Sequence, residues 1–151
     1  MGIRVVPPGP DPLLRTLAEF RFELRCFVHF SERAALEAGL QPQQHQLLLQ
    51  VAGAPEGGVV TIAYAAERLG LKHNSAVELV DRSEREGLLT RTVDTCDGRR
   101  AILRLTRKGK QVMGRLAGEH AWELNERAPR LAQALEHISM HAHGGVPAKA
   151  R

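Results

Sequence analysis

The feature that most constrains the fold of this chain is a pair of short helical patterns joined by a tight turn. Thr61 is a suitable N-cap for a first helix over residues 62–69. Gly70 follows between two leucines, and glycine adopts at little cost the positive φ that such a turn requires. A second helix is predicted over residues 74–86. Two helices joined in this way indicate a helix-turn-helix, a motif whose second helix can lie in the major groove of DNA.

A β-hairpin follows the second helix directly. Strands are predicted over residues 88–93 and 101–105, and the loop 94–100 between them ends in two arginines. Val59–Val60 is a candidate for a further short strand. The predicted fold class is therefore mainly α with a small β-hairpin wing (α+β), a winged helix-turn-helix.

The positive charge of the chain is concentrated in this region. Residues 60–110 contain 11 Lys and Arg against 7 Asp and Glu, and the rest of the chain contains 10 of each, so the region accounts for the whole formal net charge of +4. A basic surface confined to one module is typical of a protein that binds a polyanion such as double-stranded DNA. A solvated basic surface without a ligand is the alternative interpretation.

Long helical patterns flank the helix-turn-helix on both sides. Residues 13–39 place apolar side chains three and four apart and on more than one face, which predicts a helix that packs against several neighbours, as in a homodimer interface. Thr106 is a suitable cap for a later helix that Pro129 is expected to break. The predicted organisation is an extended N-terminal arm (1–12), a single domain (13–143) made of N- and C-terminal dimerisation helices (13–39 and 106–143) around a winged-helix lobe (41–105), and a flexible tail (144–151).

The sequence does not support several other classes of protein. No run of about 18 apolar residues predicts a transmembrane helix, and the start of the chain lacks the apolar segment of a secretory signal, so a cytoplasmic location without a membrane partner is expected. Phosphate-binding loops, nucleophile elbows and zinc-protease motifs are absent, so the chain is expected neither to be an enzyme nor to need a cofactor. The seven histidines show no firm metal-ligand spacing, and no metal site is predicted.

A series of short motifs gives the sequence a family resemblance. The motifs L-G-L, L-V-D-R, E-x-x-G-L, D-x-R-R and L-T-x-x-G occur in this order between Leu69 and Gly109. With the order of elements over about residues 13–140, they resemble the MarR family of bacterial winged helix-turn-helix transcriptional regulators. The resemblance implies an obligate homodimer whose first and last helices interlock, and a regulator, most often a repressor, that binds a pseudo-palindromic operator. It also implies that a small ligand between the dimerisation helices and the DNA-binding lobe alters DNA affinity.

The resemblance also implies roles for single residues. In the family, the helix after L-G-L enters the major groove, and the wing reaches the neighbouring minor groove, where an aspartate orients an inserted arginine. Carried over to this chain, Asp97 orients and Arg99 inserts, and a cation suits the negative potential of a narrow minor groove. The other basic residues of the wing region are interpreted as phosphate contacts. The predicted DNA-binding residues are His73, Asn74, Ser75, Val77, Glu78, Arg82, Asp97, Arg99, Arg100, Arg104 and Lys108.

Two parts of the second helix have alternative interpretations. Glu78 stands where many relatives have a basic or small residue. Its carboxylate either accepts a hydrogen bond from a cytosine amino group or pairs with Arg82 one turn later, and pairing is favoured. Asn74 and Ser75 contact bases, cap the helix, or do both. No operator sequence follows from these residues, but half-sites about one turn of DNA (10–10.5 bp) apart are expected.

Residues outside the lobe are candidates for a sensing function. Phe20, Phe27, His29 and Trp122 are predicted to line a ligand pocket, with ordinary core or interface packing as the alternative. Cys26 is a candidate for redox sensing, although an inert packed thiol is the default for cysteine. The alternative functions are therefore a redox- or metal-responsive sensor of the same fold, and a winged-helix module that binds protein instead of DNA.

Overall fold

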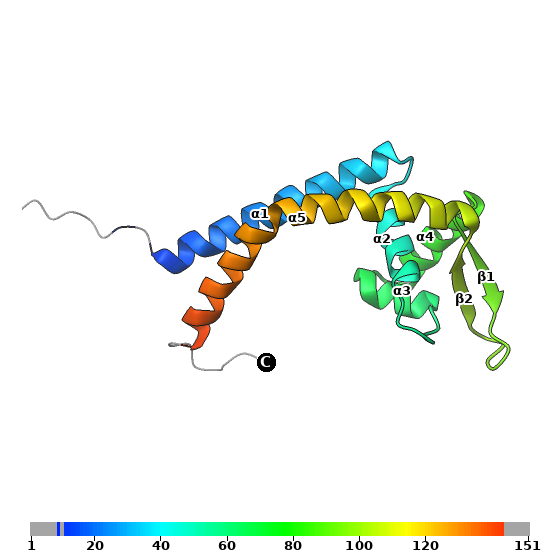
Figure 1. Cartoon of the computed structure of the whole chain (residues 1–151). Coiled ribbons are helices and arrows are strands. Elements are labelled where there is room, and N and C mark those ends of the chain that lie inside the picture. Colours follow the sequence, from blue (N-terminus) through cyan, green and yellow to red (C-terminus); the bar gives the residue numbers. More distant parts are fainter. Residues whose placement is uncertain (1–8, 10, 144–151) are drawn as a thin grey trace, which may run out of the picture. The chain divides into compact units, whose positions relative to one another are not determined.

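The computed structural model describes residue 9 and residues 11–143, which form helices and one β-hairpin (Figure 1). This confirms the predicted fold class, mainly α with a small β wing. The predicted arm (1–12) falls mostly, and the predicted tail (144–151) entirely, outside the described residues. In chain order the elements are α1 (Pro12–Glu37), α2 (Pro42–Ala52), α3 (Ile62–Leu69), α4 (His73–Arg85), β1 (Leu89–Val93), β2 (Ala101–Leu105) and α5 (Arg107–His143).

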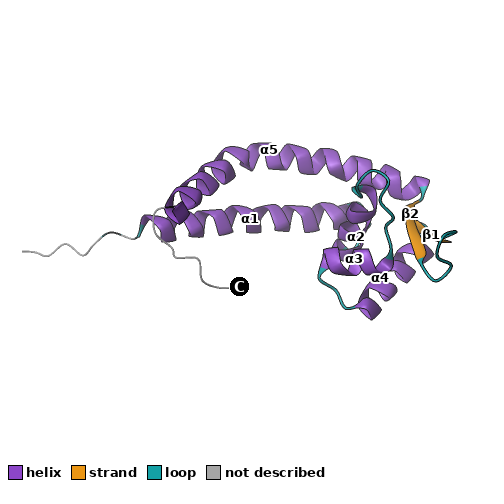
Figure 2. Cartoon of the chain, turned by 90° about the horizontal axis from the view of Figure 1, so that it is seen from below, coloured by secondary structure: helices purple, strands orange, loops and turns teal. Residues whose placement is uncertain are grey.

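The sequence predicts where α1 ends, but it predicts a break in α5 that the structure does not show. α1 ends as expected, because Gly39 adopts φ 80° and the Leu40 N–H donates to the Ala35 carbonyl, as in a glycine-terminated helix. Pro129, by contrast, does not break the last helix, and α5 is continuous through it (Figure 2). The predicted break was wrong because a proline removes one helical hydrogen bond, and a helix this long keeps many others on either side. None of the described helices is long and apolar enough to cross a membrane.

The described chain divides into two compact units. The first comprises residues up to 29 and from 122 onward, which are the first part of α1 and the last part of α5. The second comprises residues 30–121 and contains α2, α3, α4 and the hairpin. Each unit has its own packing.

A buried ion-pair cluster joins the two helices of the first unit. Glu23 on α1 is only 6% exposed, and its carboxylate oxygens accept hydrogen bonds from Arg127 (2.8 Å) and Arg130 (2.7 Å) on α5. Arg127 also pairs with Glu123 at 2.6 Å. Burial by itself raises the pKa of Glu23, but the hydrogen bonds from the two guanidinium groups outweigh it and hold that pKa below its ordinary value.

The first unit leaves many large apolar side chains exposed. Phe22 and Trp122 are 58% and 65% exposed. Exposure of many large apolar side chains is unusual for a surface that has no partner. Two helices alone offer too few neighbours to bury apolar residues on several faces. The other large apolar residues of this unit with exposed side chains are Leu14, Leu17, Leu24, Val28, Leu124, Leu135 and Met140.

The second unit has a hydrophobic core on which α2, α3, α4 and the hairpin converge (Figure 2). The strands are antiparallel, with Leu89 opposite Leu105. The Val60 carbonyl accepts a hydrogen bond from the Leu103 N–H (2.8 Å), and Thr61 forms an isolated β-bridge with Ile102. The predicted strand at Val59–Val60 is absent from the described chain. Fully buried side chains of this core include Leu47, Leu48, Val80, Leu88, Leu89 and Leu116.

The turn between α3 and α4 has the predicted geometry. Thr61 caps α3, because its hydroxyl oxygen accepts a hydrogen bond from the Tyr64 N–H at 3.1 Å. Gly70 adopts a left-handed conformation with φ 62°, and the Leu71 N–H donates to the Ala66 carbonyl. These contacts end α3 and start α4 within three residues. The helix-turn-helix predicted from the sequence is therefore confirmed.

Gly109 is required where α5 begins against the hairpin. Thr106 caps α5 by accepting a hydrogen bond from the Gly109 N–H (3.0 Å), and a Cβ at position 109 would overlap the Leu88 carbonyl oxygen. Gly109→Ala is therefore expected to lower the free energy of unfolding by about 2–3 kcal/mol, because the backbone must move to admit the methyl group. Urea unfolding measures this loss. Gly114→Ala is the control in the same helix, where a Cβ meets no atom within 4 Å, and equal losses in both variants would contradict the account.

Two histidine rings meet in the core of the second unit. His45 is 3% exposed, and its ring centroid lies 4.8 Å from that of His120. The His120 ring nitrogens lie 2.6 Å from the Leu116 carbonyl oxygen and 2.8 Å from the Ser31 hydroxyl. Burial lowers the pKa of His45 most, and the charge of His120 lowers it further. Protonation of His45 is therefore less favourable in the folded chain than in the unfolded chain.

The second unit is therefore expected to lose stability as the pH falls through about 6.5. The unfolded chain protonates His45 at its ordinary pKa, whereas the folded chain resists protonation until the pH is lower, so protons favour unfolding in that window. Urea unfolding at pH of about 7.5 and about 5.5 measures the difference, and we expect the lower stability at the lower pH. His45→Gln should remove most of it, and an unchanged difference in that variant would contradict the assignment.

Candidate nucleic-acid interface

One side of α4 faces the core and the other faces solvent. Ala76, Leu79, Val80 and Ser83 are buried, as the sequence predicts. The predicted DNA-binding residues of this helix are exposed, apart from the half-buried Val77, and are His73, Asn74, Ser75, Val77, Glu78 and Arg82. The structure therefore brings this part of the predicted site together on one helix.

Neither alternative interpretation of the α4 side chains is realised in the structure. The helix begins at His73, and no side-chain hydrogen bond caps it, so Asn74 and Ser75 do not act as caps. Within residues 11–143, no ion pair joins Glu78 to Arg82, so the favoured pairing was wrong. An exposed ion pair of this kind contributes only a few tenths of a kcal/mol, too little to order two long side chains.

Arg91 of β1 fixes the hairpin to α4. Its guanidinium pairs with Asp81 (2.8 Å) and Glu84 (2.7 Å) on α4, and its backbone N–H donates to Glu84 Oε1 at 3.1 Å. The side-chain hydrogen bond from Arg91 lowers the pKa of Glu84, and burial opposes it without cancelling it. Three separate contacts thus hold the strand and the helix in one arrangement.

Two aspartates organise the wing loop. Asp94 is 6% exposed, and its carboxylate accepts hydrogen bonds from the Cys96 N–H (2.9 Å) and from Arg100 Nη2 (2.8 Å). The hydrogen bond from Cys96 and the charge of Arg100 hold the pKa of Asp94 below its ordinary value, although burial opposes them. Asp97 accepts a hydrogen bond from the Arg99 N–H (3.1 Å), and its other oxygen lies 3.5 Å from Arg100 Nε.

Asp97 therefore contacts Arg99 through the main chain and not through its guanidinium. The resemblance implied that Asp97 orients the Arg99 side chain, whereas in the structure the guanidinium beside Asp97 belongs to Arg100. The Arg99 side chain is exposed and takes part in no ion pair within the described residues. Arg99 is thus free to contact a ligand, while Arg100 is shared between two carboxylates.

The other two predicted basic contacts differ in their surroundings. Arg104 on β2 is exposed and belongs to no ion pair in the described part of the chain. Lys108 in the first turn of α5 donates from its amino group to the Glu86 carbonyl at 2.9 Å, just beyond the end of α4. A lysine in this position satisfies a carbonyl at a helix C-terminus. Lys108 therefore joins α5 to α4, and Arg104 is the more accessible cation.

The candidate sensing residues lie on α1, on α5 and in the wing loop. Cys26 is half-buried in α1, and Cys96 is exposed in the wing loop. In the part of the chain that the structure describes, no three His, Cys, Asp or Glu side chains come together as a metal site requires. The residues predicted to line a ligand pocket are half-buried or exposed: Phe20, Phe27, His29 and Trp122.

Sequence reasoning missed the acidic partners of the wing arginines. Asp81, Glu84 and Asp94 hold Arg91 and Arg100, and none of the three was predicted to do so. One signal was present in the sequence. Arg91 occupies the same side of its strand as the buried Leu89, and a charge on the side of a strand that faces a helix calls for an opposite charge on that helix.

Taken together, the turn, the exposed face of α4 and the hairpin define a winged helix-turn-helix protein. A family model described as MarR family matches residues 38–100, and solved MarR family transcription regulators share the fold. Over residues 38–100 the chain is similar to the MarR family, and the resemblance seen in the sequence is confirmed there.

Three solved structures illustrate the likeness. AbsC of Streptomyces coelicolor is 21% identical, with a TM-score of 0.63 over 95% of this chain and 100% of AbsC. The multiple antibiotic-resistance repressor of Listeria monocytogenes is 20% identical, with a TM-score of 0.65 over 89% of this chain and 99% of that protein. A mutant of S. aureus MepR bound to an oligodeoxyribonucleotide is 20% identical, with a TM-score of 0.62 over 82% of this chain and 88% of the MepR chain. No curated protein sequence matches this chain.

Proposed function

We propose that this protein is a bacterial transcriptional regulator that binds double-stranded DNA as a homodimer at a pseudo-palindromic operator and represses transcription in the cytoplasm. The observation that supports the proposal most is the combination of an exposed polar face on α4 with a wing whose Arg99 side chain is exposed and, among the described residues, belongs to no ion pair. The region from 60 to 110 also holds all of the net positive charge. The DNA-bound MepR mutant shares this fold, which adds support.

The proposed binding mode assigns one groove to each element. The exposed face of α4 lies in the major groove, where the side chains of Asn74 and Ser75 contact bases. Arg99 enters the neighbouring minor groove, whose negative potential attracts a guanidinium. The ion pairs between Arg91 and α4 hold wing and helix together before DNA arrives, so little ordering entropy is lost on binding.

The proposed homodimer forms through the first unit. Its exposed apolar side chains, including Phe22 and Trp122, require a partner to bury them. A second copy of the same chain supplies an equal apolar surface, as symmetric dimers do. Analytical ultracentrifugation of the full chain should show a dimer. A stable monomer at micromolar concentration would contradict this part of the proposal.

Binding is expected to depend steeply on salt. Each phosphate that a basic side chain neutralises releases a counterion, and a dimer with about 6–10 such contacts should lose about 10³–10⁵-fold in affinity between about 50 and 200 mM salt. Fluorescence anisotropy of a labelled operator at increasing salt concentrations measures the slope. A flat dependence would mean that the basic surface does not contact the DNA backbone.

The proposed function is tested by selecting fragments of the host genome on the purified protein at about 150 mM salt, where weak non-specific binding is reduced. We expect enrichment of a pseudo-palindromic sequence, and loss of that enrichment with the Arg99→Ala variant. If no sequence is enriched, and the weak residual binding is the same with Arg99→Ala, the lobe is a module that binds a protein partner and the proposal is wrong.

A further inference from the structure

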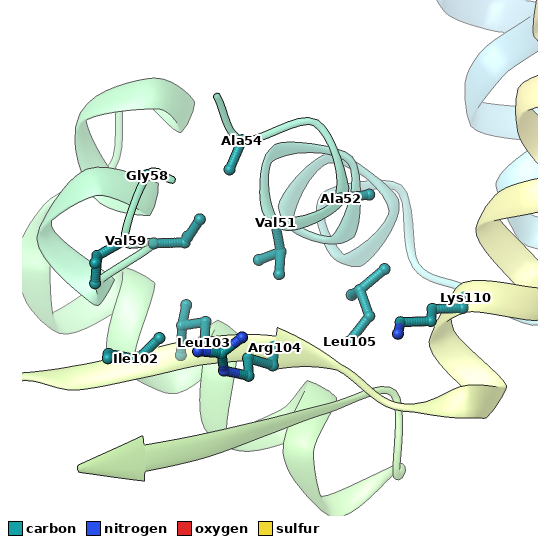
Figure 3. A pocket seen from close by; sticks show the side chains of 11 residues that line it. Val51, Ala52, Ala54, Gly58, Val59, Ile102, Leu103, Arg104, Leu105 and Lys110 are labelled. Atoms are coloured by element: carbon teal, nitrogen blue, oxygen red, sulfur yellow. The ribbon is translucent and has the colours of Figure 1, made fainter. Parts of the chain in front are cut away.

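A cavity of about 360 Å³ lies in the second unit, between the end of α2, the loop that leads to α3, and β2. Its size is within the range of small-molecule sites. Figure 3 shows Val51 of α2 pointing toward β2, with Val59 on one side and Leu105 on the other. The residues that the sequence indicated as a ligand pocket belong to the first unit, so this cavity is a different site.

The cavity combines an aliphatic lining with two cations. Val51, Val59, Ile102 and Leu105 give it apolar walls, and none of the described residues that line it is aromatic. An aliphatic wall without aromatic rings suits a flexible hydrocarbon chain better than a flat ring, because there is no ring on which to stack. The apolar part of a ligand for this cavity is therefore aliphatic.

The charge of the lining determines the polar part of the ligand. Among the described residues that line it, Arg104 and Lys110 are the only charged ones, and none is Asp or Glu. Within the described residues neither cation belongs to an ion pair. In Figure 3 the Lys110 side chain extends toward Leu105 at the apolar wall. A carboxylate at this edge would accept charge-assisted hydrogen bonds while its chain covers the aliphatic surface.

We propose that this cavity binds a small aliphatic carboxylic acid, with its chain against Val51 and Val59 and its carboxylate at Lys110. Arg104, which also lines the cavity, is one of the predicted phosphate contacts of the wing. A bound anion lowers the positive potential at this cation, so the acid weakens DNA binding; this regulatory consequence rests on the proposed DNA-binding function, whereas the binding site itself does not.

The site is tested without DNA by adding octanoate to the ¹⁵N-labelled full-length protein and following amide chemical shifts. We expect saturable shifts at Val59, Ile102 and Lys110. The neutral analogue octan-1-ol should bind about tenfold more weakly, because it forms no charge-assisted hydrogen bond. Equal affinities for acid and alcohol, or shifts confined to other residues, would overturn the proposal. Displacement of octanoate by an equal concentration of inorganic phosphate would reduce the site to a simple anion contact and would also overturn it.

Matched variants separate the cavity from its surroundings. Lys110→Gln is expected to weaken octanoate binding about fivefold or more, and Arg107→Gln, which removes the same charge from the same turn of α5 outside the cavity, should leave it unchanged. Val59 is 46% exposed, so Val59→Asp should fold normally while its carboxylate repels the ligand and abolishes binding. Equal effects of Lys110→Gln and Arg107→Gln would show that general charge, and not this site, attracts the acid.

The regulatory consequence is measured separately, as the effect of octanoate on affinity for a selected operator. Weaker DNA binding by the wild type, but not by Val59→Asp, is expected. If octanoate binds and DNA affinity stays constant, the regulatory consequence is wrong although the site is real. If octanoate does not bind and the operator does, the site is wrong and the proposed function is unaffected.

Discussion

Replacing Arg99 with alanine is expected to lower the affinity for operator DNA by about tenfold to a hundredfold, because one arginine contact in a groove contributes about 1–3 kcal/mol. The loss should be large because the guanidinium is exposed and pairs with no carboxylate in the described residues, so no internal ion pair has to break before it contacts DNA. Fluorescence anisotropy on a selected operator, with sedimentation to confirm that the dimer is intact, measures the effect.

Arg115→Ala is the matched control for this prediction. Arg115 is an exposed arginine of α5 that lies outside the predicted interface, and its loss removes the same charge. Its effect on operator affinity should be less than about threefold, as for a distant surface charge that salt screens. If Arg115→Ala weakens binding as much as Arg99→Ala does, then net charge, and not the wing, accounts for the affinity.

Replacing Glu23 with alanine is expected to lower the free energy of unfolding of the first unit by about 3–5 kcal/mol, the usual cost of removing one partner of a buried ion pair. The carboxylate is the only acceptor that the structure assigns to Arg130, and one of two for Arg127, within residues 11–143. Arg127 is only 19% exposed, so without Glu23 it keeps a largely buried charge with one partner fewer. Thermal or urea unfolding measures the loss.

Glu19→Ala is the control for Glu23, because Glu19 is an exposed carboxylate of the same helix one turn earlier. The cluster also has an expected pH dependence. Since the pKa of Glu23 is lower in the folded chain than its ordinary value of about 4.5, its contribution to stability is complete above that pH and is lost as the pH falls through the folded pKa. A Glu23→Ala variant that keeps both the stability and the acid sensitivity of the wild type would show that the cluster contributes little.

The elements of the lobe were predictable because each depends on local chemistry. Thr61 and Gly70 each favour one backbone conformation, and α3 begins and ends at these residues. The inward face of α4 follows from the helical period alone. Pro129 shows the limit of local rules: it was expected to end a helix, but the hydrogen bonds on either side maintain α5.

The parts of the site that could not be predicted depend on contacts between distant residues. Arg91 and Asp81 lie ten positions apart in the chain, and only the packing of β1 on α4 brings their charges together. The acidic partners of Arg100 could not be predicted from the sequence either. Asp94 and Asp97 both lie in the wing loop, and the conformation of that loop determines which arginine they hold. The family pattern indicated Arg99, whereas the local geometry selects Arg100.

The most direct test of the proposed DNA-binding mode is a hydroxyl-radical footprint of the full-length protein on a selected operator. We expect two protected half-sites about 10–10.5 bp apart, flanked by minor-groove protections at the positions of the two wings. With Arg99→Ala at saturating protein, the flanking minor-groove protections should disappear, while the protections of the two half-sites remain. A single protected segment without two-fold symmetry, or flanking protections that persist in the variant, would contradict the assignment of α4 and the wing to their grooves.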